Sequence, residues 1–111
     1  MMDIEKFIAN WLKVSNDFDT EQYLGMYHKN AVLDDPSVGR KFMGHQGIKN
    51  YFESYFIGYN TKTRLTDLTV KGDKAHLEVE FTGNFPEGKI KGIFDFAFKE
   101  DKISEARADL I

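Results

Sequence analysis

Cysteine is absent from this chain of 111 residues. Its absence excludes disulfide bonds, thiolate metal sites and a cysteine nucleophile, and it fits the reducing conditions of the cytoplasm. No apolar run is long enough to cross a membrane. The first residues, MMDIEKFIANWLKV, lack the basic and continuous apolar regions of a signal peptide. We therefore expect a cytoplasmic protein without a membrane partner.

A basic stripe is also missing. The chain has 15 Lys and Arg against 18 Asp and Glu, a net charge of -3 with the charges interspersed, so a nucleic-acid partner is not expected. There are only two prolines, and no linker, repeat or low-complexity tract interrupts the chain. With 41% hydrophobic residues and ten phenylalanines, residues 1–111 are expected to form one domain with a real core.

Apolar spacing predicts three helices. Residues 4–16 follow the helical period behind the capping residue Asp3, and a short helix capped by Asp19 or Thr20 is expected to extend to residue 27. A third helix begins near residue 44, with apolar side chains at 48, 51, 52, 55 and 56 forming one stripe.

Strands are predicted from short apolar runs and from a later change of period to two. Residues 31–35 form a short strand, and residues 61–71, 74–82, 89–99 and 102–110 follow as an antiparallel meander. The connecting turns fall at 72–73, 84–88 and 100–101. Helices followed by a meander indicate the α+β class.

The step Asp34-Asp35-Pro36 ends the first strand and allows two interpretations. Proline has no N–H and favours an extended conformation at Asp35, so the step can simply terminate a strand. Alternatively, it presents a carboxylate where a strand opens into a loop, which is a common position for chemistry.

The strand at 89–99 has two apolar faces. Phe94, Phe96 and Phe98 alternate with Ile93, Asp95 and Ala97. One face can pack on the helices, and Asp95, on a face with Ile93 and Ala97, is expected to be a buried, hydrogen-bonded acid. Because an exposed row of phenylalanines would be an apolar patch, we expect a second copy of the chain to cover the other face and form a homodimer.

The order of elements resembles the nuclear transport factor 2-like (NTF2-like) superfamily, in its SnoaL-like and ketosteroid isomerase-like branch. The similar segments are WLKVSNDFDTEQYLGMYHKNAVLDDP, GHQGIKNYFESYF and GIFDFAF. The resemblance implies a cone-shaped barrel in which three helices pack on a curved antiparallel sheet around an apolar pocket. Homodimers are also typical of the family. Its members include isomerases, cyclases, dehydratases, hydrolases and noncatalytic binders, so the fold alone does not decide activity.

The resemblance to ketosteroid isomerases assigns three catalytic positions. Asp35, before Pro36, matches the aspartate that shuttles the proton, and Asp95 matches a second aspartate that stays protonated and hydrogen-bonds the enolate oxygen. Trp11 stands where the family has a tyrosine, the main oxyanion donor. Of two supporting tyrosines, Tyr27 matches one and Phe52 replaces the other. Because an indole N–H is a weaker, differently placed donor, and one oxyanion donor is worth roughly 10²–10³ in rate, the steroid reaction itself is not expected.

Further residues are expected to bind a small apolar ligand in the pocket: Tyr27, Tyr51, Tyr55, Val79, Phe81, Ile93 and Ala108. The three histidines share neither a predicted face nor a helical spacing, so no metal site is expected, and the glycines follow no phosphate-loop pattern, so no cofactor is expected. Two function classes remain open. The chain is a ligand-binding domain without chemistry, or it is an isomerase or cyclase that uses Asp35 as general base on a carbonyl compound.

Overall fold

Six strands form one curved sheet in the computed structural model, which describes residues 2–111. The strands are β1 (Tyr27–Asp35), β2 (Arg40–Met43), β3 (Lys62–Lys71), β4 (Lys74–Thr82), β5 (Lys89–Lys99) and β6 (Lys102–Leu110). Their order in the sheet is β2-β1-β6-β5-β4-β3, and all neighbours are antiparallel except β1 and β6. The meander of four long strands is confirmed.

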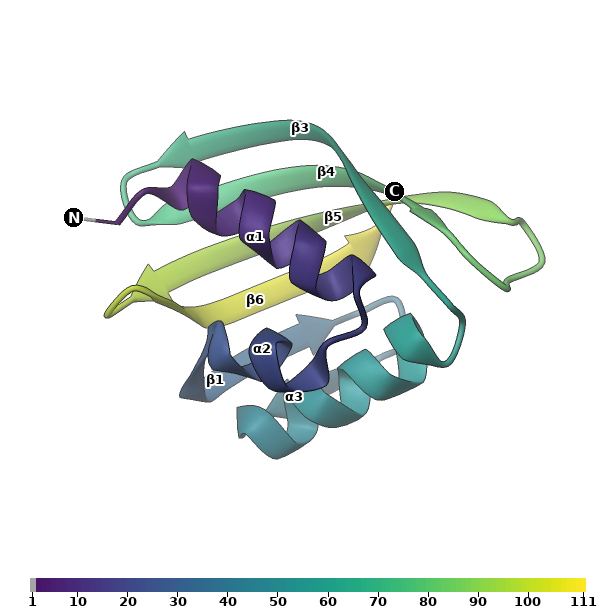
Figure 1. Ribbon diagram of the computed structural model, residues 1–111, viewed down its shortest axis with the longest axis horizontal. Coiled ribbons are helices and arrows are strands. Elements are labelled where there is room, and N and C mark those ends of the chain that lie inside the picture. Colours follow the sequence, from purple (N-terminus) through teal and green to yellow (C-terminus); the bar gives the residue numbers. More distant parts are fainter. Residues whose placement is uncertain (1) are drawn as a thin grey trace.

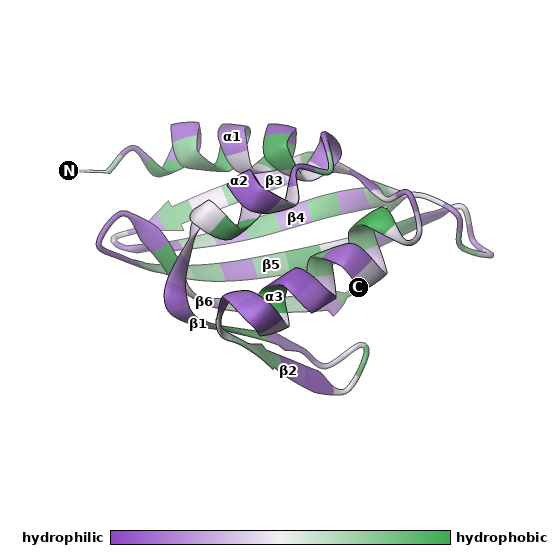
Figure 2. Ribbon diagram, turned by 60° about the horizontal axis from the view of Figure 1, so that its bottom comes forward, coloured by the Kyte–Doolittle hydropathy of each residue, from purple (hydrophilic) through white to green (hydrophobic). Residues whose placement is uncertain are grey.

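Three helices lie on one face of this sheet, which we call the inner face (Figure 2). They are α1 (Ile4–Asn16), α2 (Thr20–Gly25) and α3 (Gly44–Phe52), the last continued by a π-helical segment at Glu53–Ile57. Asp3 caps α1 by accepting from the Lys6 N–H, and Asp19 caps α2 by accepting from the Gln22 N–H. These capping bonds satisfy donors at the two helix starts. No helix of residues 2–111 is long and apolar enough to span a membrane.

The N-terminal half of the sheet differs from the prediction in two places. The second helix ends at Gly25 rather than residue 27, so β1 starts at Tyr27 and is nine residues long. Residues 40–43, expected in a loop, form β2 and pair with the end of β1. Only Phe42 is buried in this four-residue edge strand, which leaves no alternating pattern to recognise in the sequence.

The core lies between α1 and the middle of the sheet (Figure 1). The indole of Trp11 packs edge-on against Phe94 and Phe96, with ring centroids 5.0 and 5.3 Å apart. The side of β5 that carries these phenylalanines is therefore the inner face, and Phe94, Phe96 and Phe98 are all buried within one chain. The prediction that they form a dimer interface was wrong. The helices cover the bulkier apolar row, and the row with Asp95 lies on the opposite, outer face.

Candidate ligand-binding site

One pocket of about 300 Å³ opens beside the end of β1, a volume at the small end of the range for ligand sites. Its residues come from four regions: the end of β1 and its loop, α3 with the segment that follows, the hairpin between β4 and β5, and the end of β6. The lining residues are Asp35, Ser37, Val38, Tyr51, Tyr55, Phe56, Tyr59, Thr61, Phe81, Phe85, Pro86, Glu87, Ile90, Ala108, Asp109 and Leu110.

Asp35 is the one buried carboxylate in this lining, with 6% of its surface exposed. Its Oδ1 accepts hydrogen bonds from the Ser37 N–H at 3.0 Å and from the Ser37 hydroxyl at 2.5 Å. These bonds hold the turn after Pro36, so the interpretation of the step as a strand terminator has a structural basis. The same carboxylate also lies in the pocket wall, so both interpretations of the step apply to one residue.

Tyr51 places a phenol next to this carboxylate. Burial, followed by the negative charge of the nearby Asp35, raises the pKa of Tyr51 well above its usual value. The phenol therefore stays protonated beside Asp35. All the described hydrogen-bond partners of Asp35 are donors, an arrangement that suits a carboxylate.

Aromatic rings form a continuous wall from this pair to the pocket mouth. Ring centroids are 5.6 Å apart between Tyr51 and Tyr55, 6.5 Å between Tyr55 and Tyr59, and 6.3 Å between Tyr59 and Phe85. The hairpin that carries Phe85 is tied down by the Asn84 N–H, which donates to the Tyr59 carbonyl at 2.7 Å. The pocket is thus aromatic along one side and has a carboxylate at its inner end.

The family of the chain follows from comparison of its sequence with known families. Residues 8–106 match the SnoaL-like domain. The chain belongs to the SnoaL-like family. No curated protein matches the sequence.

Several solved structures have a fold similar to that of this SnoaL-like domain, and they include proteins described as NTF2-like. A candidate polyketide cyclase from Sinorhizobium meliloti matches with a TM-score of 0.85 and 19% identity over 93% of each chain. A Catenulispora acidiphila protein of ketosteroid isomerase-like fold, in complex with trimethylamine, has a TM-score of 0.81 and 11% identity over 92% of this chain and 82% of its own. TerC, co-crystallised with polyporic acid, has a TM-score of 0.82 and 15% identity over 96% and 89%. These TM-scores show a shared fold, and the predicted NTF2-like cone is confirmed.

The SnoaL-like domain brings together only part of the predicted site. Five predicted residues line the pocket: Asp35, Tyr51, Tyr55, Phe81 and Ala108. Three others lie in the core outside its lining: Trp11, Tyr27 and Val79. The Trp11 Nε1–H donates to the Tyr27 hydroxyl at 3.4 Å, and this hydroxyl donates to that of Tyr23 at 2.8 Å. The indole N–H, proposed as an oxyanion donor, thus points to another side chain and not to the pocket.

Asp95 and Ile93 lie on the outer face of the sheet, opposite the pocket, so their predicted place beside Asp35 was wrong. The Asp95 side chain is 45% exposed and accepts a hydrogen bond from the Nδ1 of His76 at 2.5 Å. The family comparison assigned this aspartate to the pocket, but strand alternation puts it on the face away from Phe94 and Phe96. A second acid therefore does not assist Asp35 from this strand.

Several lining residues were missed because they lie outside the predicted strands and helices. Tyr59 follows the π-helical segment, while Phe85, Pro86 and Glu87 form the hairpin tip. One signal was available in the sequence. Phe85-Pro86 places a large apolar side chain in a loop, where a solvent-exposed position would favour polar residues.

The outer face carries a second, wider hollow of about 820 Å³. A row of mostly charged residues runs across all six strands there, each paired in register with the next: Lys41, Asp34, Arg107, Asp95, His76 and Thr69. The charges alternate in sign along this row, which we call the charge ladder. Apolar residues such as Val32 and Ala97 also line the hollow.

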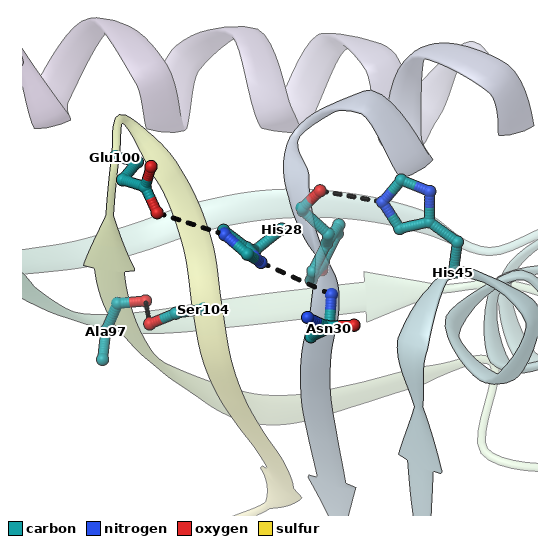
Figure 3. Close-up of polar contacts among 7 residues, drawn as sticks. His28, Asn30, His45, Ala97, Glu100 and Ser104 are labelled. Carbon is teal, nitrogen blue, oxygen red and sulfur yellow. Dashed lines mark hydrogen bonds and ion pairs between the residues drawn. The ribbon is translucent and has the colours of Figure 1, made fainter.

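The side chains of the two remaining histidines, His28 and His45, make polar contacts between different elements. His45, at the start of α3, lies 2.8 Å from the Tyr27 carbonyl, and His28 on β1 lies 3.3 Å from Glu100 in the turn before β6 (Figure 3). Within residues 2–111, no three His, Cys, Asp or Glu side chains gather as a metal-binding group.

Proposed function

We propose that this SnoaL-like domain binds a small, mostly apolar molecule in the pocket beside Asp35. The observation that carries the proposal is one buried carboxylate, that of Asp35, in a cavity lined mostly by aromatic and aliphatic side chains. Both hydrogen bonds from Ser37 go to the Oδ1 atom of Asp35, and a further partner at its other oxygen would offset more of the cost of burying the carboxylate. A ligand with an apolar body and one polar group fits this arrangement, with the polar group at Asp35.

Fold relatives support ligand binding without identifying the ligand. One is in complex with trimethylamine and another was crystallised with polyporic acid. Two ligands of such different chemistry indicate that the fold does not determine what is bound. The choice has to come from the residues that line the pocket in each chain.

An isomerase or cyclase reaction with Asp35 as general base is the second candidate, favoured by the carboxylate of Asp35 and the protonated phenol of Tyr51, which line the same pocket. A buried carboxylate in a pocket wall can take a proton from the carbon next to a carbonyl. A neighbouring protonated phenol can stabilise the oxyanion that results. The relative described as a candidate polyketide cyclase adds support at the level of the fold.

Benzylacetone, a dialkyl ketone that carries a phenyl ring, tests both candidates in one NMR experiment in D₂O. Saturation transfer to the ketone reports binding, and loss of its α-proton signals reports proton abstraction. We expect saturable binding that Val38→Trp weakens by about tenfold, because Val38 lines the pocket and the indole would occupy ligand space. Exchange that stops in Asp35→Asn supports the enzyme. Binding without exchange leaves a binding domain, and the absence of saturable binding contradicts the proposal.

We further propose that two copies associate through their outer sheet faces. Ile93, Val32 and Ala97 are only partly exposed apolar residues on that face, and the helices do not cover it (Figure 2). The alternating signs of the charge ladder allow a second copy, related by a two-fold axis, to place its acids opposite these bases.

A further inference from the structure

Charge is distributed unequally between the two hollows. The outer hollow has three carboxylates, four Lys or Arg side chains and His76 in its lining. The described residues that line the Asp35 pocket include three carboxylates, Asp35, Glu87 and Asp109, and no Lys, Arg or His. The inner pocket therefore offers negative charge without a compensating cation in its wall.

The two arginines nearest to the pocket carboxylates, Arg40 and Arg107, do not form an ion pair with Asp35 among the described side chains. Arg40 is the register partner of Asp35 on β2, but its guanidinium lies 4.8 Å from the ring centroid of Phe42, and no ion pair joins it to Asp35 among the described side chains. Arg107 approaches Asp109 at 3.5 Å, with Arg107 half exposed. Asp109 is thus partly neutralised and Glu87 is exposed at the rim, whereas Asp35 has hydrogen-bond donors but no cation.

The walls also suit a positive charge. The faces of aromatic rings attract cations, and the attraction is strongest where water is excluded. The rings of Tyr51, Tyr55, Tyr59 and Phe85 follow one another at centroid separations of 5.6 to 6.5 Å. They lead from the pocket mouth to the carboxylate of Asp35. A ligand cation would therefore contact aromatic rings on its way in and a carboxylate at its final position.

We propose that the pocket selects an organic ammonium ion, a protonated or methylated amine carried on a small apolar body. This inference rests on the proposed binding function and names its ligand class. An anionic ligand would meet Asp35 without a cation to hold it, and a neutral ligand would leave the charge of Asp35 unpaired. An ammonium group pairs the carboxylate and uses the aromatic wall at the same time.

Three probes of nearly equal size and different charge test the proposal by calorimetric titration: phenethylammonium, phenethyl alcohol and hydrocinnamate. We expect phenethylammonium to bind at least roughly tenfold more tightly than the alcohol, from a charge-assisted hydrogen bond and the ring contacts, and hydrocinnamate to bind most weakly. Equal or better binding of the alcohol overturns the ammonium proposal and leaves the proposed binding function intact. If none of the three binds, both fail.

Two variants assign the preference to this pocket. Asp35→Asn is expected to bring the affinities of phenethylammonium and the alcohol within about threefold of each other, whereas the adjacent Asp34→Asn, on the outer face, keeps the wild-type order. Because Asp35 also holds a turn, Tyr59→Leu provides an independent test at a residue that is 43% exposed. It should reduce the preference for the ammonium probe severalfold. A preference unchanged in Tyr59→Leu and in a folded Asp35→Asn protein would overturn the proposal.

Discussion

Three buried tyrosine hydroxyls, those of Tyr23, Tyr27 and Tyr51, have raised pKa values. Burial raises the pKa of Tyr27 to about 12 and raises the pKa values of Tyr23 and Tyr51 well above the usual phenol range. The hydroxyls of Tyr23 and Tyr27 also bond to each other in the core. At neutral pH these three side chains are therefore hydrogen-bond donors rather than charges, and Tyr51 is the one of them at the pocket wall.

Alkaline unfolding is the first prediction. In the unfolded chain a phenol ionises near pH 10, so above that pH the folded chain binds more protons and the free energy of unfolding falls as the pH rises. For Tyr27 alone, a pKa of about 12 corresponds to roughly 3 kcal/mol that is present below pH 10 and lost by about pH 12. Tyrosinate absorbance and circular dichroism should show these phenols ionising together with unfolding. Ionisation of all five tyrosines near pH 10 in a chain that stays folded would contradict this prediction.

At the scale of elements, the π-helical segment after α3 places the aromatic wall. Its wider turns are marked by the Gly58 N–H, which donates to the Glu53 carbonyl five residues earlier at 2.9 Å. Gly58 then lies between the segment and Tyr59. A Cβ at position 58 would lie 2.4 Å from the Ser54 carbonyl oxygen, so only glycine fits there without a shift of the backbone.

Matched glycine substitutions test this element. Gly58→Ala should lower the free energy of unfolding by about 1–3 kcal/mol, because the added methyl group collides with the backbone. Gly25→Ala at the end of α2, where a Cβ would meet nothing within 4 Å, should leave stability unchanged or raise it by up to about 1 kcal/mol. Urea unfolding measures both variants. Equal stability of the two would show that the wide turn does not require glycine.

The elements differ in how far the sequence predicted them. The bounds of β4, β5 and β6 follow from a period of two and from the turns at Gly72-Asp73 and Glu100-Asp101, where the backbone takes positive φ. The π-helical segment was not predictable, because its apolar residues keep the spacing of an α-helix. The inner face of β5 could have been predicted from bulk, since three phenylalanines bury more apolar surface than Ile93 and Ala97.

At the scale of the whole molecule, the proposed interface between outer sheet faces predicts that the protein in solution has the mass of a dimer. Light scattering at micromolar concentration should give the mass of two chains. Ile93→Lys should shift the protein toward one chain without unfolding it, because Ile93 lies on the outer face and outside the core. Phe96→Lys is unsuitable for this test because Phe96 is 2% exposed in the core. A single-chain mass for the wild type, or a dimer unaffected by Ile93→Lys, would contradict the proposed interface.

The pocket itself was predicted only in outline, because it depends on how distant segments meet. Asp35 could be identified from its place before Pro36, and Tyr51 and Tyr55 from the stripe of the third helix. Phe85, Pro86, Glu87 and Ile90 come from the hairpin between β4 and β5. Its approach to Tyr59 depends on one backbone hydrogen bond that no local pattern predicts.

The central claim is that the Asp35 pocket is the ligand site, and locating a bound ligand by NMR tests it most directly. Titration of the isotope-labelled protein with benzylacetone should shift the amide signals of Val38, Tyr59 and Phe85 around the Asp35 pocket. Those of Val32, Thr69 and Ala97 in the outer hollow should stay in place. Shifts confined to the outer hollow, or saturating binding that leaves the Asp35 pocket unperturbed, would contradict the claim that this pocket is the ligand site.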